Sequence, residues 1–253
     1  MKIVAITQAR IGSSRLPGKV LLKIQDKSLL EIHLTKVLKS KKIDKLIVAT
    51  TFENDVIKII DICNKLNVLY YQGSMTNVLE RFYKAIENDK PDYVVRITSD
   101  CPLIDAKLID EVIEFAVDHN FDYASNTLNP TYPDGFDVEV FKFSALEKAY
   151  LEAENLLDKE HVTPYIWRNS NLKGGGLFFA GSYENAIDYS NFRVTVDEQI
   201  DFELVKALIE QVGDETWLNY TNYLIENPSL IALNNSIKRN EGFDKSIKKD
   251  YNG

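Results

Sequence analysis

Apolar and polar positions follow two alternating patterns along the chain. Short runs rich in β-branched residues, typical of buried strands, are separated by longer segments in which apolar residues recur with a helical period. In the first hundred residues the predicted strands cover residues 3–6, 46–49, 68–71 and 92–98. Because this alternation is typical of parallel strands joined by helices, it predicts an α/β protein with a mostly parallel, doubly wound sheet flanked by helices.

Helix boundaries in this part carry capping signals. Ser28 and Glu31 have the spacing of a capping box, and Asp105 is expected to cap the helix that follows Pro102. The three polar or reactive residues that fall in these helices are interpreted as structural: Cys63 in an apolar stripe, and His33 and His119.

The pattern changes after residue 120. Residues 121–143 combine short strands with turn residues, helices are predicted around residues 145–156 and 161–167, and a glycine-containing turn at 174–176 precedes an aromatic strand through 178–179. Residues 192–196 are predicted as a further strand and 204–209 as part of a helix. We interpret residues 121–181 as a small strand-containing insertion that shapes an acceptor-binding pocket.

The run QARIGSSRLPGK, residues 8–19, directly follows the first predicted strand. Its glycines allow close approach of backbone N–H groups to a ligand, its hydroxyls can donate, and its cations can pair with phosphate. The residues concerned are Gly12 and Gly18, Ser13 and Ser14, and Arg10, Arg15 and Lys19. Open α/β sheets bind ligands at the carboxyl ends of their strands. The run therefore predicts a phosphate-binding loop, although not a Walker loop, and a basic surface turn is the alternative.

Two aspartates come directly after predicted strands. Asp100 follows the strand at 92–98 and Asp197 follows the one at 192–196. Mg²⁺ prefers one or two carboxylates together with phosphate oxygens and water, so both are candidate magnesium ligands if their strands are neighbours. Taken singly, each could instead be a turn former or a helix cap, and Asp197 in particular could be an N-cap.

Composition narrows the class of protein. The chain has 253 residues, 45% of them hydrophobic, with a net charge of −8 and a pI near 5.1, so a nucleic-acid or membrane-surface role is not expected. Two cysteines without metal-ligand spacing fit a reducing compartment. We expect neither a signal peptide nor a membrane span, and we expect a cytoplasmic location.

The loop and several further motifs resemble the cytidylyltransferases that activate 3-deoxy-manno-octulosonate and acylneuraminate, most closely their spore coat polysaccharide relatives. The motifs are QARIGSSRLPGK, NVLERFYKA, VVRITSDCPLID and RVTVDEQIDFELVKAL, and the spore-coat resemblance covers nearly the whole chain. It implies a single nucleotidyltransferase domain, residues 1–253, with a Rossmann-like, GT-A-like fold. Ser99 and Cys101 flank Asp100 where octulosonate enzymes have a glycine and an acidic residue, which puts octulosonate as the acceptor in doubt.

The resemblance also implies roles for individual residues. The expected catalytic residues are Arg15, Lys19, Asp100 and Asp197, the last two as Mg²⁺ ligands. The expected nucleotide-binding residues are Gln8, Ala9, Arg10, Gly12, Ser13, Ser14, Thr50 and Arg81, although a solvated surface arginine is an alternative for Arg81. Expected at the acceptor are Arg96, Asp137, Glu139 and His161; Arg96 lies in an apolar strand and must be paired if it is buried.

These residues together predict a Mg²⁺-dependent transfer of CMP from CTP to a small, acidic or modified sugar, with release of pyrophosphate, for surface polysaccharide or glycan synthesis. The alternatives are a glycosyltransferase of similar fold, although Asp100-Cys101-Pro102 lacks the second aspartate of a D-x-D motif, and a nucleotide-binding protein without catalysis. A homodimer is expected. Residues 233–253 are polar, yet resemble the usual ending of the spore-coat group, and are interpreted as an arm that packs on a neighbour.

Overall fold

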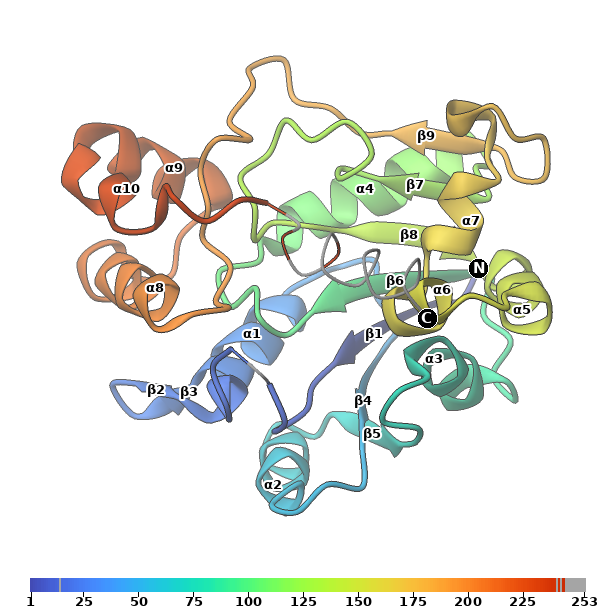
Figure 1. Cartoon of the computed structure of the whole chain (residues 1–253), viewed down its shortest axis with the longest axis horizontal. Helices are drawn as coiled ribbons and strands as arrows, with labels where there is room; N and C mark the ends of the chain where they lie inside the picture. The colour runs from blue at the N-terminus through green and yellow to red at the C-terminus, as the bar shows by residue number, and fades with distance from the viewer. Residues whose placement is uncertain (14, 240, 242, 244–253) are drawn as a thin grey trace.

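The computed structural model describes residues 1–13, 15–239, 241 and 243. Its central feature is a seven-stranded sheet in the order β5-β4-β1-β6-β8-β7-β9, in which β8 is antiparallel to both of its neighbours (Figure 1). The strands are β1 (Ile3–Gln8), β4 (Lys45–Thr50), β5 (Leu69–Gln72), β6 (Tyr93–Thr98), β7 (Tyr123–Ser125), β8 (Glu139–Lys142) and β9 (Ala180–Ser182). The predicted α/β class and mostly parallel sheet are confirmed.

Helices cover both faces of this sheet and extend its ends. Figure 1 shows α8, α9 and α10 grouped at one end of the molecule and α5, α6 and α7 at the other. The helices are α1 (Leu29–Val37), α2 (Ile57–Lys65), α3 (Val78–Ile86), α4 (Ala106–Asp118), α5 (Phe143–Glu152), α6 (Leu156–His161), α7 (Pro164–Arg168), α8 (Gln199–Val212), α9 (Trp217–Glu226) and α10 (Pro228–Asn234). Two 3₁₀ turns, η1 (Lys19–Leu21) and η2 (Asn171–Lys173), and a hairpin of β2 (Lys23–Ile24) and β3 (Lys27–Ser28) complete the described structure.

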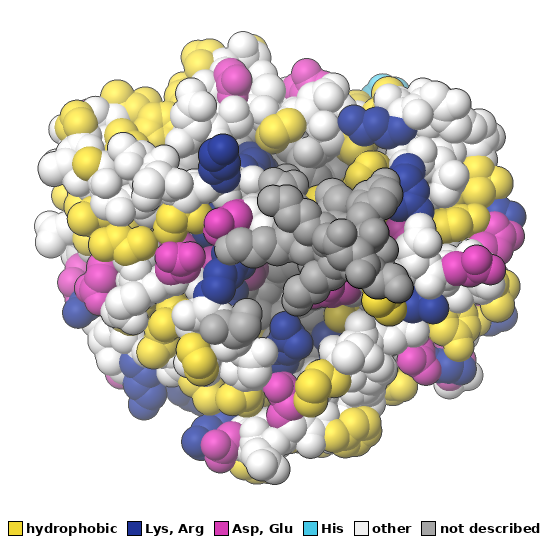
Figure 2. Space-filling model, viewed as in Figure 1, with side chains coloured by type: hydrophobic (Ala, Val, Ile, Leu, Met, Phe, Trp, Pro, Cys, Tyr) yellow, Lys and Arg dark blue, Asp and Glu magenta, His cyan; other side chains and the backbone are white. Residues whose placement is uncertain are grey.

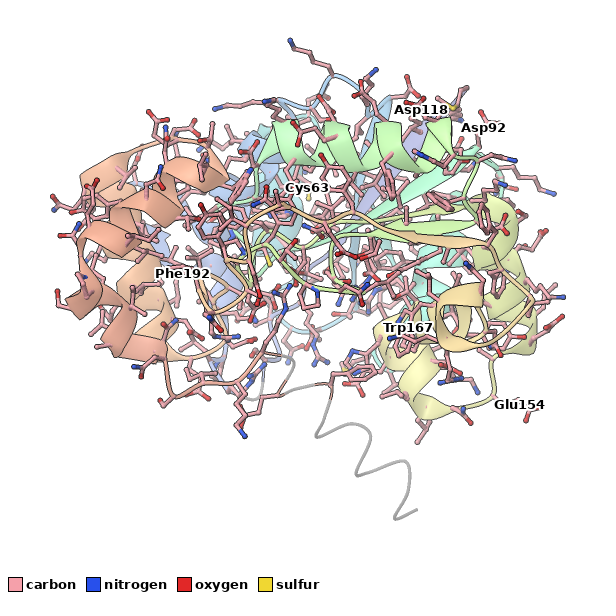
Figure 3. The ribbon with its side chains drawn as sticks, turned by 90° about the horizontal axis from the view of Figure 1, so that it is seen from above. Cys63, Asp92, Asp118, Glu154, Trp167 and Phe192 are labelled. Carbon is pink, nitrogen blue, oxygen red and sulfur yellow. The ribbon has the colours of Figure 1, made fainter. Side chains whose placement is uncertain are left out.

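Side chains of β1 alternate between two buried clusters, as the period of two in a strand requires. Ile3 and Ala5 face the cluster that includes the buried residues of α1, α2 and α4. Val4 and Ile6 face a second cluster with α3 and α5. Cys63 belongs to the first cluster and lies inside the molecule in Figure 3, which confirms its structural interpretation. Helices on both faces leave the carboxyl edge of the sheet as the place where polar strand ends can meet.

The capping predictions are confirmed in part. Asp105 caps α4 by accepting hydrogen bonds from the N–H groups of Lys107 and Leu108. Ser28 caps α1 by accepting from the Glu31 N–H, but the Glu31 carboxylate pairs with Lys65 at 2.7 Å. The capping box was therefore only half right, because a lysine of α2 binds the carboxylate that a full box requires.

The predicted strand at 192–196 is wrong. This segment forms one isolated β-bridge, between Asp134 and Arg193, and is not part of the sheet. Its backbone groups bond instead to loops, with the Val194 N–H donating to the Asp134 carbonyl at 2.7 Å and the Val196 N–H to the Asp100 carbonyl at 2.8 Å. The backbone hydrogen bonds of an extended apolar segment can therefore be made with loops as well as with a sheet. Sequence periodicity does not distinguish these two cases.

Residues 121–181 supply β7, β8 and β9 to the main sheet together with α5, α6 and α7. The insertion therefore extends the sheet, and its acceptor-binding role stays a prediction. The aromatic residues at 178–179 lie just before β9, and the glycine turn at 174–176 follows η2, with Gly174 in the left-handed region at φ 80°. Among the described residues, no helix has both the length and the apolar character that crossing a membrane would need.

Candidate active site

The carboxyl ends of β1, β4 and β6 meet at one edge of the sheet. Gln8 at the end of β1 is in register with Ala49 on β4 and with Thr98 on β6. The Ser99 hydroxyl, just after β6, donates to the Gln8 carbonyl at 2.6 Å. The loop that follows each of these strands therefore opens onto the same edge, where open α/β sheets bind ligands.

A lysine side chain lies between two aspartates at this edge. The Lys19 ammonium donates to Asp100 Oδ2 and to Asp197 Oδ1, both at 2.9 Å, and to the Val196 carbonyl at 2.8 Å. Lys19 is placed there by a tight turn into η1 that begins at Gly18, whose φ of 68° lies in the left-handed region that favours glycine. The structure thus brings together three of the predicted catalytic residues, which are far apart in the sequence.

Burial and pairing act in opposite directions on these groups. Burial disfavours the charged Asp100 carboxylate, but the Lys19 charge and hydrogen bond outweigh it and hold the pKa of Asp100 below its ordinary value. Burial likewise lowers the pKa of Lys19, whereas Asp100 and Asp197 raise it more. The Asp100 carboxylate can therefore bind a cation at neutral pH, and the Lys19 ammonium already lies between it and Asp197.

Asp197 also has two arginine partners. Arg15 Nη2 lies 2.7 Å from Asp197 Oδ1, and Arg193 Nη2 lies 3.0 Å from Asp197 Oδ2. Arg193 is buried and also pairs with Asp134 at 2.6 Å and Asp201 at 3.0 Å. The N-cap alternative for Asp197 is wrong, because Glu198 is the N-cap of α8 and forms a reciprocal capping box with Asp201.

Three predicted nucleotide-binding residues have buried polar atoms without a hydrogen-bond partner. These atoms are Gln8 Oε1, Thr50 Oγ1 and Arg81 Nε. Arg81 is only 2% exposed, so the solvated alternative for it is wrong, and its Nη1 donates to the Ser74 carbonyl at 2.6 Å. Buried polar atoms that lack partners are uncommon, and a bound ligand would satisfy them.

The remaining loop residues lie in the same region. Ala9 is buried and its N–H donates to the Ala49 carbonyl at 3.1 Å, whereas Arg10 is exposed. The Ser13 hydroxyl accepts from the Leu16 N–H at 3.4 Å, and the Gly12 N–H donates to Glu53 Oε1 at 3.0 Å. The prediction for Ser14 lies outside the described residues.

The predicted acceptor residues form a second polar group, around β8. Glu139 is buried, pairs with Arg96, and accepts hydrogen bonds from Tyr123 Oη at 2.6 Å and Thr163 Oγ1 at 2.5 Å. Arg96 is mostly buried, and the pair confirms that it has a partner. Asp137, two residues before Glu139, pairs with Arg239 at 2.6 Å.

Burial also shifts the pKa values on the acceptor side. Burial raises the pKa of Asp137 to about 7, opposed by the Arg239 charge and reinforced by Asp134 and Glu139. Burial and the Arg96 charge lower the pKa of His161 to about 4, and its Nε2 is buried without a hydrogen-bond partner. His161 is therefore neutral at pH 7, as is His33, whose pKa burial lowers to about 4 and which bonds the Thr7 hydroxyl and the Cys101 carbonyl, both at 3.0 Å.

Residues after α10 contact both polar groups. Arg239 pairs with Asp137 and donates to the Tyr132 carbonyl at 2.9 Å, and Glu241 lies 3.9 Å from Arg15. The Phe243 ring lies 5.0 Å from the His161 ring and 6.2 Å from that of Trp167. These described residues contact their own chain; packing of the 233–253 arm on a neighbour stays a prediction.

Two views show the setting of these contacts. In Figure 2, lysine and arginine side chains lie among aspartate and glutamate side chains on the central part of the face seen in Figure 1. In Figure 3, Trp167 lies on the α7 side of the molecule and Phe192 on the α8 side.

Sequence reasoning missed several residues of this region. Arg193, Glu53 and Arg239 each contact a residue that the sequence had singled out. Arg193 had a usable signal, because it lies between apolar residues in FRVTV, as Arg96 does in its strand, and a buried arginine needs a partner. Nothing in the sequence pattern pointed to Glu53.

A family model described as cytidylyltransferase matches residues 4–235. The chain belongs to the cytidylyltransferase family. It is accordingly a nucleotidyltransferase, which agrees with the convergence of Lys19, Asp100 and Asp197 at the sheet edge.

Curated relatives of this cytidylyltransferase span different shares of the chain. An uncharacterized protein of Methanocaldococcus jannaschii is 40% identical over 252 residues, covering 94% of this chain and 97% of the relative. The spore coat polysaccharide biosynthesis protein SpsF of Bacillus subtilis is 33% identical over 223 residues, with 84% and 88% covered. The 3-deoxy-manno-octulosonate cytidylyltransferase of Bdellovibrio bacteriovorus is 34% identical over 118 residues, 47% of each chain.

Solved structures agree with the family. A cytidylyltransferase of Leptospira borgpetersenii has a TM-score of 0.85 at 31% identity and covers 91% of this cytidylyltransferase and 97% of its own chain. A CMP:2-keto-3-deoxy-manno-octonic acid synthetase, solved with CTP, has a TM-score of 0.63 at 17% identity, with 84% and 100% covered. The second likeness shows the shared fold.

Proposed function

We propose that this protein transfers CMP from CTP to a hydroxyl of a small sugar. The observation that carries the proposal is the Lys19 ammonium between Asp100 and Asp197 at the carboxyl edge of the sheet. Support for the nucleotide comes from the synthetase of the same fold whose structure contains CTP, and support for a sugar acceptor from the octulosonate cytidylyltransferase relatives. That the base is cytosine and that the acceptor is a sugar are both part of the proposal.

The reaction needs positioning and charge neutralisation more than covalent participation of the protein. The acceptor oxygen attacks the α-phosphorus and forms a P–O bond, the bond from that phosphorus to the α,β-bridging oxygen breaks, and pyrophosphate leaves. The proton of the acceptor hydroxyl passes to solvent. Arg15 and Lys19 would pair with the phosphates and stabilise the charge that develops on the leaving pyrophosphate.

The two aspartates fit a magnesium ion. An ammonium already lies within 2.9 Å of one oxygen of each carboxylate, which shows that both can approach one cation. Mg²⁺ bound there would take its remaining ligands from phosphate oxygens and water, neutralise phosphate charge and lower the pKa of the attacking hydroxyl. Arg193 would hold Asp197 in position through its 3.0 Å contact.

The acceptor side suits a molecule that is rich in hydroxyl groups. Asp137, Glu139 and Arg96 offer acceptors and donors close together, and the unpartnered His161 Nε2 can bond one more polar group. The likeness to SpsF leads us to propose a role in surface polysaccharide synthesis. The expected homodimer and cytoplasmic location stay predictions.

A pyrophosphate-release assay tests this function. The protein is incubated with Mg²⁺, each of the four nucleoside triphosphates in turn, and a panel of neutral and acidic sugars. Pyrophosphate should appear with CTP and only when an acceptor sugar is present. Equal release with another triphosphate, or release that no sugar stimulates, would contradict the proposal. A thermal-shift screen gives a parallel reading, since a ligand at 100 times its Kd stabilises by about 2.7 kcal/mol.

A further inference from the structure

The carboxylate of Glu53 is bound to the backbone of the loop at residues 8–19. Glu53 Oε1 accepts from the Gly12 N–H at 3.0 Å and Oε2 from the Ile11 N–H at 3.3 Å. The Thr51 hydroxyl donates to the same Oε2 at 2.6 Å. A side chain from the loop after β4 therefore provides an anion for two amides of the loop after β1.

Gly12 is what makes room for this carboxylate. A Cβ at position 12 would lie 2.3 Å from Glu53 Oε1, well inside contact distance, and Gly12 does not have a left-handed φ. A side chain at position 12 would therefore require the flexible end of Glu53 to move, so the lack of one matters here for space and not for an unusual backbone angle. Consecutive amides that face an anion through a gap left by glycine are a recurring form of phosphate site.

The surroundings of Glu53 are cationic. Arg81 is 2% exposed, its Nε has no hydrogen-bond partner, and its Nη1 donates to a neutral acceptor, the Ser74 carbonyl. Burial and the nearby Arg10 charge lower the pKa of Arg81 to about 10, while Glu53 acts in the opposite direction. Glu53 therefore supplies negative charge at a place where two arginines favour an anion.

We propose that the Glu53 carboxylate occupies a phosphate subsite formed by the Ile11 and Gly12 amides, and that a phosphate group of the triphosphate displaces it. An N–H that donates to Glu53 is not free for a phosphate oxygen. The Glu53 carboxylate and a phosphate group at the same two amides would also repel each other. The inference rests on the proposed function only in taking the ligand to be a nucleoside triphosphate.

Isothermal titration with sodium tripolyphosphate, which has neither a base nor a transferable nucleotidyl group, tests this displacement. The proteins compared are the wild type, Glu53→Gln and the matched control Asp55→Asn. Asp55 lies two residues away, and its exposed carboxylate pairs with Lys58 at 3.2 Å, so its loss also removes one negative charge near the loop. Glu53→Gln should bind tripolyphosphate about tenfold more tightly than the wild type, because a tenfold change in Kd corresponds to the free energy of about one modest charge-assisted hydrogen bond. The Kd of Asp55→Asn should stay within about twofold of the wild-type Kd.

Equal or weaker binding by Glu53→Gln would overturn the proposal and make Glu53 a brace for the loop. Failure of tripolyphosphate to bind any of the three proteins would overturn it as well. If Glu53→Gln does not fold, amide NMR of the wild type decides: the Ile11 and Gly12 resonances should shift on titration, and unchanged resonances at saturation would refute displacement. None of these results depends on CMP transfer, so they are separable from the pyrophosphate-release assay.

Discussion

Carboxylates on the two sides of the sheet edge are neutralised in different ways. Asp100 and Asp197 share one ammonium, that of Lys19, and Asp197 pairs with Arg15 and Arg193 besides. On the acceptor side Asp137 and Glu139 each have an arginine of their own, Arg239 and Arg96. In the proposed mechanism this shared cation would give way to a metal and a triphosphate while both carboxylates stay charged. The two separate ion pairs on the acceptor side fix the arrangement of their side chains. This suits recognition of a neutral polyol more than binding of a metal.

The largest effect should come from the shared cluster. Asp100→Asn keeps the shape of the side chain but removes a charge on which the proposed metal and triphosphate binding would depend, so pyrophosphate release should fall by about 10²- to 10³-fold. Asp92→Asn is the control, because Asp92 lies before β6, at the other end of the strand, and is exposed. Wild-type turnover in Asp100→Asn would show that Asp100 is not a metal ligand in the reaction.

Loss of the ammonium should be the next largest effect, and it acts on folding. Lys19→Met leaves Asp100 and Asp197 facing each other without their shared donor, and should lower the free energy of unfolding in urea by about 1–3 kcal/mol at pH 7. Lys27→Met, at an exposed position of the β2–β3 hairpin, is the control. If both variants were equally stable, the cluster would contribute nothing to the fold.

The acceptor side should show the opposite pH dependence. The folded pKa of Asp100 is below its ordinary value, so its contribution to stability is present above about pH 4 and lost as pH falls further. Burial raises the pKa of Asp137 to about 7, so its contribution is present below about pH 4 and lost as pH rises through 7.

Between pH 4 and pH 7 the free energy of unfolding of Asp137→Asn should therefore fall less than that of the wild type. The partial exposure of the side chain limits the change to about 1–2 kcal/mol. Urea unfolding at four pH values measures it, with Asp61→Asn, at an exposed position of α2, as control. A wild-type pH profile in Asp137→Asn would mean that Asp137 ionises normally and that the contrast between the two sides is absent.

The smallest effect concerns the aromatic contact after α10. Phe243→Ala removes a ring 6.2 Å from that of Trp167 and should shift the Trp167 emission to longer wavelength, with a loss of stability of about 0.5–1 kcal/mol. Phe179→Ala, whose half-exposed ring contacts Phe121, is the control. Unchanged emission would show that Phe243 does not lie against Trp167 in solution.

Sequence reasoning succeeded where position along a strand fixes position in space. Parallel strands of one sheet end at the same edge, so the loop at residues 8–19 and Asp100 could be placed at that edge from their positions after predicted strands, and the structure shows that β1 and β6 are also neighbours. Asp197 was placed correctly for a partly wrong reason. Its segment is not a strand, yet the Val196 N–H bonds the Asp100 carbonyl and brings Asp197 to the cluster.

What could not be predicted depends on partners distant in the sequence. The Gly12 and Glu53 contact joins residues 41 positions apart, and the Asp137 and Arg239 pair joins residues 102 apart. Neither glutamate nor arginine has a periodicity that reveals its partner. The half-formed capping box at Ser28 has the same origin, because Lys65 of α2 binds the Glu31 carboxylate.

A double-mutant cycle on pyrophosphate release tests the central claim, that Asp100 and Asp197 serve one metal triphosphate. It compares Asp100→Asn, Asp197→Asn and the variant with both substitutions, under the same CTP, Mg²⁺ and acceptor concentrations. Groups that act as a unit are strongly non-additive, so we predict that the double variant is within about threefold of the slower single variant. Effects that multiply would show two independent carboxylates and contradict the account.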